Sequence, residues 1–274
     1  MRKIFFSLFI TILISTVAPV GSASETGFGP LITADQLKKL ISKNGPFILD
    51  IRGGSVKDGF IKGAISVDYG AFRGPSKSPG QLVTDDHLTK LFQKIGLEYD
   101  KPTVIVYQGK NETDFGAAAR VYWTLKSAGI RKLAILNGGM TAWTNGANRT
   151  VVSVPTMPKP SKIVVTLSKK WLATRSDILE VVQGNKKAKL LDARPEDFYR
   201  GRKKHSAAAR PGTLPQSDFF AHSNWFAGGA AGFDVSSTQS LINTAGFGAN
   251  DRVVSFCNTG HWAATNWFAL SEIG

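Results

Sequence analysis

The stretch FILDIR, residues 47–52, is an apolar run that ends in Asp-x-Arg, and KLLDAR, residues 189–194, repeats this pattern. Short apolar runs of this kind are typical of strands. Two further pairs of strand-like stretches follow in the same order: GFIKGAISV (59–67) with PGTLPQSDF (211–219), and KPTVIVYQG (101–109) with NDRVVSFCN (250–258). The last pair has the continuous apolar composition of strands that are buried on both faces of a parallel sheet. The repeat predicts two copies of one structural unit.

Helical patterns alternate with these strands. Alanine-rich, tryptophan-containing segments at 116–130 and 263–274 follow the last strand of each half. A helix is also expected at 33–45, with Thr33 as its N-cap, and the spacing at 168–185 predicts two short helices. Alternating strands and helices favour two α/β units, each with a mostly parallel sheet covered by helices on both faces.

A proline-rich segment divides the two halves. VVSVPTMPKPSK, residues 151–162, carries three prolines and no helical period, which is a linker composition. We therefore expect the first domain at about 29–150 and the second at about 163–274.

The N-terminus has the pattern of an export signal. Arg2 and Lys3 precede an apolar run at 4–17, and Gly21 and Ala23 lie where a signal peptidase needs small residues. The apolar run is short for a membrane span. We expect residues 1–23 to be removed, which predicts a periplasmic or secreted protein without stable membrane insertion after cleavage.

The chain is basic and has one cysteine. Its 274 residues include 34 Lys and Arg against 20 Asp and Glu, a net charge of +14, so the protein attracts anions. The positive charge is scattered, and an exported chain is a poor candidate for nucleic-acid binding. Cys257 has no partner for a disulfide within the chain. It is either a reactive thiol or a small apolar core residue.

The position of Cys257 favours the reactive thiol. It ends a predicted parallel strand, and the turn at 257–262 leads into a helix expected to begin near Ala263. Ligands collect beyond the carboxyl ends of such strands, where unpaired N–H groups and a positive helix end stabilise an anion. A thiolate is favoured there over a thiol, and Gly260 lets the backbone curl.

The motifs together resemble those of the tandem-domain rhodanese sulfurtransferases of the thiosulfate or 3-mercaptopyruvate kind. The matching stretches are ILDIR (48–52), GFIKGAI (59–65), LNGGMTAW (136–143), LLDARPEDFYRG (190–201) and Cys-x-x-Gly (257–260). The resemblance implies two rhodanese-like α/β domains. It also implies that Cys257 accepts sulfane sulfur from a small anionic donor as a persulfide and passes it to a thiol or cyanide, with no cofactor. The first domain is then a catalytically silent partner that lines the cleft.

The resemblance also assigns residues to the site. The expected substrate-binding residues are Asn258, Thr259, Gly260, His261, Trp262 and Arg200, while Asp192 and Arg194 hold the loop in shape. For two of these residues the role stays open. His261 either assists proton transfer or donates a hydrogen bond to an anion, or it is simply exposed to solvent. Trp262 is either a wall of the pocket or a packing residue. Phe198 stands where the family usually has a substrate-binding arginine. The basic run at 200–205 supplies charge to the cleft or is a solvated surface.

Other chemistries fit less well. A cysteine-dependent phosphatase needs an arginine at the position of Ala263, and an intramolecular dithiol mechanism needs a second cysteine. The histidines at 87, 205, 222 and 261 show no metal-ligand spacing, so we expect no metal site. The remaining alternative is a non-catalytic sulfur-carrier or binding protein of the same fold.

The two halves differ in two respects. By alignment of the apolar runs, Gln108 stands where the second half has Cys257, which predicts a silent first domain. The first half continues with a predicted strand and helix at 131–143, and the second half shows no counterpart. We expect the second domain to lack its final strand and helix through C-terminal truncation, unless another segment fills the gap, with activity of the shortened chain in question.

Overall fold

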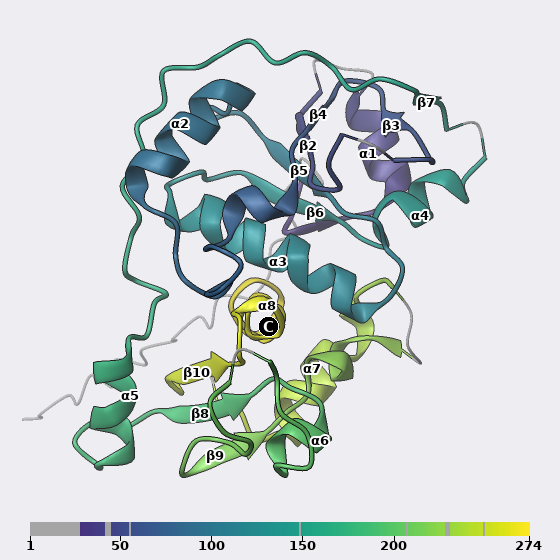
Figure 1. Cartoon of the computed structure of the whole chain (residues 1–274). Coiled ribbons are helices and arrows are strands. Elements are labelled where there is room, and N and C mark those ends of the chain that lie inside the picture. The colour runs from purple at the N-terminus through teal and green to yellow at the C-terminus, as the bar shows by residue number, and fades with distance from the viewer. Residues whose placement is uncertain are drawn as a thin grey trace, which may run out of the picture.

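The structure is a computed structural model that describes residues 28–41, 45–54, 56–147, 149–206, 208–227, 231–248 and 250–274. The predicted export signal at 1–23 lies outside these residues. Two α/β units stack on one another, with α3 of the first against α8 of the second (Figure 1). Within the described residues, no helix is both long and apolar enough to cross a membrane.

The first unit has a five-stranded sheet in which every pairing is parallel. Its strands, in spatial order, are β1 (Leu31–Ile32), β6 (Leu133–Leu136), β5 (Thr103–Val106), β2 (Phe47–Asp50) and β4 (Ala64–Ser66). Its helices are α1 (Ala34–Ile41), the 3₁₀ turn η1 (Tyr69–Phe72), α2 (Asp85–Ile95), α3 (Glu112–Ser127) and α4 (Gly139–Thr144). A small antiparallel pair joins β3 (Phe60–Ile61) to β7 (Val151–Val152).

The second unit repeats the central part of this arrangement. Its parallel sheet has the order β10 (Val253–Phe256), β8 (Lys189–Asp192) and β9 (Ser217–Phe219). Its helical elements are α5 (Arg175–Val182), α6 (Glu196–Tyr199), η2 (His222–Trp225), α7 (Val235–Thr244), α8 (His261–Phe268) and a π-helical turn, η4 (Ala269–Ile273). Among the described residues, no strand pairs with the outer edge of β10, the side on which β6 pairs with β5 in the first unit.

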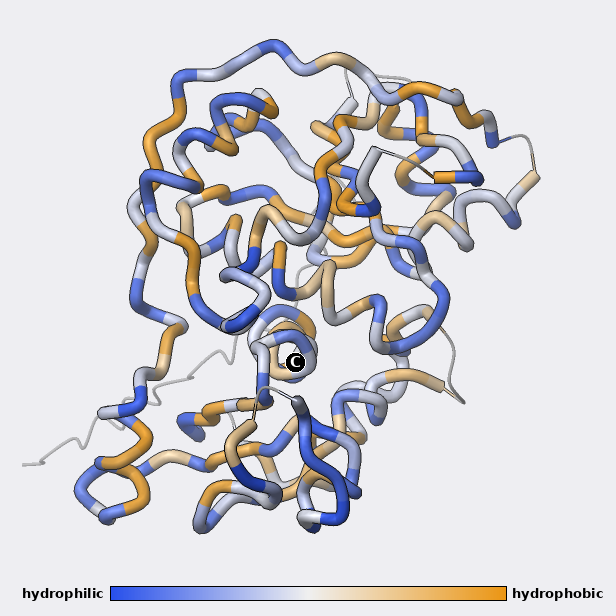
Figure 2. The backbone as a smooth tube through the Cα atoms, viewed as in Figure 1, coloured by the Kyte–Doolittle hydropathy of each residue, from blue (hydrophilic) through white to orange (hydrophobic). Residues whose placement is uncertain are grey.

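The apolar runs are buried on both faces of the sheet, as their composition predicts. In β2, Phe47 and Leu49 join one hydrophobic cluster and Ile48 joins the other, because alternate side chains of a strand point to opposite faces. Figure 2 shows hydrophobic residues gathered along the central strands of the first unit.

An aromatic cluster joins the two units. The Phe115 ring from α3 lies 5.5 Å from the Phe268 ring of α8 and 5.3 Å from that of Phe226. Glu272 completes this junction, because it accepts a hydrogen bond from Tyr122 and pairs with Lys126 at 2.6 Å. The described parts of both units therefore share one core rather than touching only at their surfaces.

The segment between β7 and α5 runs along the outside of the first unit (Figure 1). It is fixed by backbone bonds, since Thr156 donates to Ala64, Ser161 donates to Gln93 and Ser168 donates to Ser127. Residues 161–168 thus lie against α2 and the end of α3.

The helices confirm most of the sequence expectations and correct two. Thr33 caps α1, with Gln36 returning the bond. The stretch 168–185 forms one helix, α5, instead of two, because the capping box at Thr174 and Asp177 starts the helix late. Helix α8 begins at His261 and not near Ala263, because Gly260, with φ of +72°, serves as its N-cap.

Candidate active site

Cys257 lies between the last residue of β10 and the N-terminus of α8, in a loop whose Thr259 and Gly260 lie against the first unit. Its side chain is partly exposed. No side chain caps the N-terminus of α8. The first N–H groups of that helix are therefore available to an anion held beside Cys257.

The Asp192–Arg194 pair holds the cysteine loop from within the second unit. Asp192 is fully buried and accepts two hydrogen bonds from the Arg194 guanidinium, at 2.9 and 2.6 Å. The same guanidinium reaches Asn258 Oδ1 at 3.4 Å and the Gly212 carbonyl at 2.8 Å. Both residues lie where the sequence predicts them, and they connect the ends of two strands to the loop.

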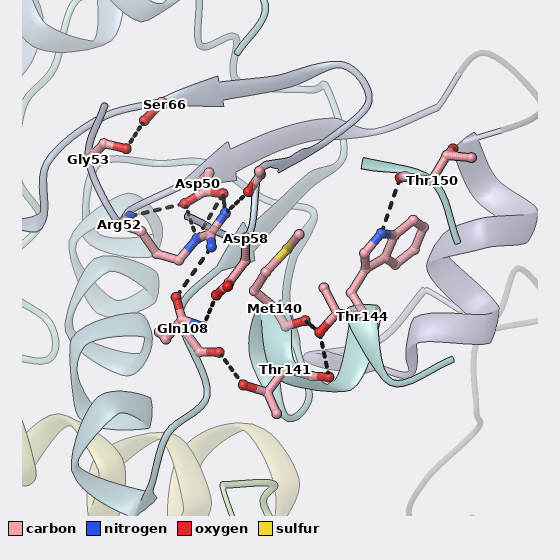
Figure 3. Close-up of polar contacts among 12 residues, drawn as sticks. Asp50, Arg52, Gly53, Asp58, Ser66, Gln108, Met140, Thr141, Thr144 and Thr150 are labelled. Carbon is pink, nitrogen blue, oxygen red and sulfur yellow. Dashed lines mark hydrogen bonds and ion pairs between the residues drawn. The ribbon is translucent and has the colours of Figure 1, made fainter. Parts of the chain in front are cut away.

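The first unit has a matching ion pair. Arg52 binds Asp50 and reaches Gln108 Oε1 at 3.3 Å, and Gln108 also donates to Asp58 (Figure 3). Gln108 is thus the structural counterpart of Asn258.

The register between strands corrects the alignment of the two halves. Asp50 pairs with Val106 of β5, and Asp192 pairs with Phe256 of β10. The residue that follows is Tyr107 in the first unit and Cys257 in the second. The sequence alignment that placed Gln108 opposite Cys257 is wrong by one position, because the apolar runs fit equally well in either register. Tyr107 is buried and donates a hydrogen bond to the Ala231 carbonyl.

His261 is bound at both ring nitrogens by the first unit. Nε2 lies 2.6 Å from the Thr113 carbonyl oxygen, to which it must donate, so Nδ1 accepts from the Tyr69 hydroxyl at 3.0 Å. Burial lowers the pKa of His261 to about 4, and the charge of Arg73 acts in the same direction. His261 is thus a neutral bridge between the units, with neither nitrogen free for a donor anion.

Trp262 packs against two aromatic rings of its own unit. It stacks on His222 with ring centroids 4.9 Å apart, and its edge meets Phe198 at 6.1 Å. Burial lowers the pKa of His222, which favours the neutral ring in this stack. These contacts make Trp262 a packing residue of the second unit.

Arg200 is the exposed residue that directly follows α6. Its side chain is 57% exposed and forms an ion pair with Glu196. The neighbouring Arg202 and Lys203 pair with Asp197. Figure 2 shows this run as a continuous hydrophilic segment beside α6. The described contacts give these residues the character of a solvated surface.

The first unit adds residues that the sequence did not single out. Tyr69 and Arg73 come from η1 and its C-terminal end, and the Arg73 guanidinium lies 5.2 Å from the Tyr69 ring. Arg120 comes from α3 and lies against Gly260, because a Cβ built on that glycine would be 2.1 Å from Arg120 Nη1. Gly80 of the first unit also lies near the loop, because a Cβ built on it would be 3.1 Å from the Cα of Thr259. No local pattern in the sequence singles these residues out, because they lie in the first half of the chain and the loop lies in the second.

Comparison with known proteins agrees with this architecture. Residues 33–146 match the family described as the rhodanese-like domain. Escherichia coli SseA, a 3-mercaptopyruvate sulfotransferase of known structure, superposes with a TM-score of 0.74 over 89% of this chain and 94% of its own, at 18% identity. The first unit thus matches the rhodanese-like domain, and the chain as a whole shares the fold of SseA.

Two sequence relatives extend the rhodanese-like match. Mycobacterium tuberculosis SseB is 27% identical over 264 residues, which cover 89% of this chain and 88% of that protein. Thiosulfate sulfurtransferase of Cricetulus griseus is 32% identical over 120 residues, 44% of this chain and 39% of that protein. The first relative spans both rhodanese-like units.

Proposed function

We propose that this protein is a sulfurtransferase that moves sulfane sulfur from a small anionic donor to a thiol or to cyanide through a persulfide on Cys257. The observation that carries the proposal is the position of the chain's single cysteine, partly exposed at the uncapped N-terminus of α8 in the tandem rhodanese-like fold. The thiosulfate sulfurtransferase and 3-mercaptopyruvate sulfotransferase named above support the same class of reaction.

The reaction consists of two nucleophilic displacements. The Cys257 thiolate attacks the outer sulfur of thiosulfate, the S–S bond breaks, and sulfite leaves with its electron pair. With 3-mercaptopyruvate, the C–S bond breaks instead, and the departing enolate of pyruvate takes up a proton. The acceptor then attacks the outer sulfur of the persulfide, and Cys257 leaves as thiolate. Electrons balance within each displacement, so no cofactor is required.

The site residues contribute to these steps in different ways. Asn258, Thr259 and Gly260 form the turn that surrounds the sulfur and expose N–H groups of α8 to the donor. Asp192 and Arg194 keep the turn in place through Asn258. The chain's net charge of +14 favours the approach of an anionic donor.

The test is sulfur transfer by the chain and by Cys257→Ser. Cyanide is the acceptor, thiocyanate is measured as product, and thiosulfate and 3-mercaptopyruvate are compared as donors. We expect turnover with at least one donor and none above background in Cys257→Ser. Labelling of Cys257 by a donor without turnover to cyanide or a thiol would instead support the sulfur-carrier alternative.

We also propose that residues 1–23 are an export signal and that the mature protein is periplasmic or secreted. The support is the basic start, the apolar run at 4–17 and the small residues Gly21 and Ala23. The N-terminal sequence of the mature protein tests this, since export predicts a chain that begins just after Ala23. An exported fraction that retains Met1 would contradict the proposal.

A further inference from the structure

Arg120 is a buried cation to which no described residue supplies an anionic partner. It is 8% exposed, and its Nε has no hydrogen-bond partner. Among the described residues, its guanidinium forms no ion pair. It makes a cation–π contact with Trp123, whose ring centroid lies 5.3 Å away. A buried unpaired charge is costly, so its presence calls for a compensating interaction.

The guanidinium points at the cysteine loop of the other unit. Its Nη1 lies against the Cα of Gly260, where any side chain would collide with it. The groups that interact with it electrostatically are Tyr69, Cys257 and a second cation, Arg73. Two arginines of the first unit therefore face the loop, and no carboxylate is among these interacting groups.

Among the described residues of the second unit, no recorded contact places an unpaired cation at the loop. Phe198 occupies the sequence position of the arginine expected after the Asp-x-Arg pair, and its ring packs on Trp262. Arg200 is exposed and paired with Glu196. The Arg194 charge is neutralised by Asp192, and His261 is neutral because burial lowers its pKa.

We propose that Arg120, supplied by the first unit, binds the oxyanion group of the sulfur donor at Cys257. This inference rests on the function proposed above and adds the residue that recognises the donor. A guanidinium suits the planar or trigonal oxygens of a carboxylate or a sulfonate, which it binds with two parallel N–H donors. The first unit is then part of the substrate site, although it carries no nucleophile.

The test uses the charge of an alkylating agent as a probe of Cys257. Iodoacetate, an anion, and iodoacetamide, which is neutral, both alkylate the Cys257 thiolate. The rate with iodoacetate divided by the rate with iodoacetamide therefore does not depend on the fraction of thiolate and reports the local electrostatic potential. In Arg120→Gln we expect this ratio to fall about tenfold, and in Arg120→Lys we expect it to stay nearer that of the unmodified chain. In the unmodified chain, sulfate should slow the alkylation of Cys257 by iodoacetate more than that by iodoacetamide, and this measurement needs no variant.

Arg149→Gln is the matched control. Arg149 is also a buried arginine over a tryptophan, with its Nε unpaired, but it binds Asp35 and the end of α4. Its loss should leave the alkylation ratio unchanged. The KM for thiosulfate and for 3-mercaptopyruvate should rise about tenfold or more in Arg120→Gln alone, and whichever KM rises identifies the donor oxyanion.

The two proposals fail in different ways. If the alkylation ratio falls in Arg120→Gln while no donor reacts with the unmodified chain, the anion site stands and the sulfurtransferase function is refuted. If the chain transfers sulfur and a folded Arg120→Gln keeps both the ratio and the KM values, the role of Arg120 is refuted and the function stands. If Arg120→Gln does not fold, the unmodified chain still tests the role of Arg120. Sulfate that slows alkylation by iodoacetate no more than alkylation by iodoacetamide would then refute that role.

Discussion

Replacing His261 by glutamine should remove a pH-sensitive contribution to stability. The imidazole bridges the two units as a neutral ring, donating to Thr113 and accepting from Tyr69. A proton added at Nδ1 would face the Tyr69 hydroxyl inside a buried contact and abolish this acceptor. A glutamine side chain also has one donor end and one acceptor end, and it does not titrate.

The magnitude follows from the pKa of the bridge. Burial lowers the pKa of His261 from 6.5 to about 4. The folded chain therefore takes up this proton at lower pH than the unfolded chain, so stability is complete above about pH 6.5 and is lost as the pH falls toward 4. The difference of 2.5 pH units (6.5 minus 4) corresponds to about 3 kcal/mol at 1.36 kcal/mol per unit.

Urea unfolding at about pH 7 and about pH 4.5 measures this contribution. We expect the unmodified chain to lose about 2–3 kcal/mol more than His261→Gln over that interval. His222 adds a loss of the same sign, since burial lowers its pKa too, and it affects both proteins alike. An equal loss in the two proteins would refute the neutral bridge, as would a His261 imidazole that NMR finds protonated at pH near 6.

Two further substitutions, each with a matched control elsewhere in the fold, distinguish effects on the cysteine loop from a general loss of stability. Gly260→Ala should cost the roughly 1–2 kcal/mol expected for a left-handed alanine and should also reduce sulfur transfer, because the new Cβ displaces the Arg120 guanidinium. Gly246→Ala, at φ of +69° with open space around it, should carry a similar backbone cost and leave transfer intact, so equal transfer by the two folded variants would refute the collision. Asp192→Asn should destabilise by about 3–5 kcal/mol by leaving Arg194 unpaired, and Asp50→Asn should lose a similar amount by leaving Arg52 unpaired. Per folded molecule, sulfur transfer should fall only in Asp192→Asn, since Arg194 holds Asn258, and an equal fall in both variants would argue against that role.

Much of the fold was accessible from the sequence because strands of a parallel sheet have a strong local signature. The apolar runs ending at Asp50 and Asp192 are buried on both faces, and the strands that they predict pair in parallel. The exact register was not accessible. A run such as VIVYQ can be aligned one residue earlier or later with an equally good match of apolar residues. Only the pairing with the Asp-x-Arg strand shows that Tyr107 is the residue equivalent to Cys257.

The candidate site was accessible only where its residues are local. Cys257 and its turn could be found because a strand end and a helix start lie next to each other in the chain. Tyr69, Arg73 and Arg120 could not be found, since their proximity to the loop depends on how the two units pack. The same packing explains His261, whose partners Tyr69 and Thr113 lie far away in the sequence.

The intact mass of the chain after reaction with a sulfur donor tests the central claim most directly. The protein is reduced, freed of reductant, exposed to thiosulfate or to 3-mercaptopyruvate and measured without an acceptor. The account predicts a gain of one sulfur atom, located at Cys257 by peptide mapping and lost again when cyanide is added. A folded chain whose mass stays unchanged with both donors would contradict it.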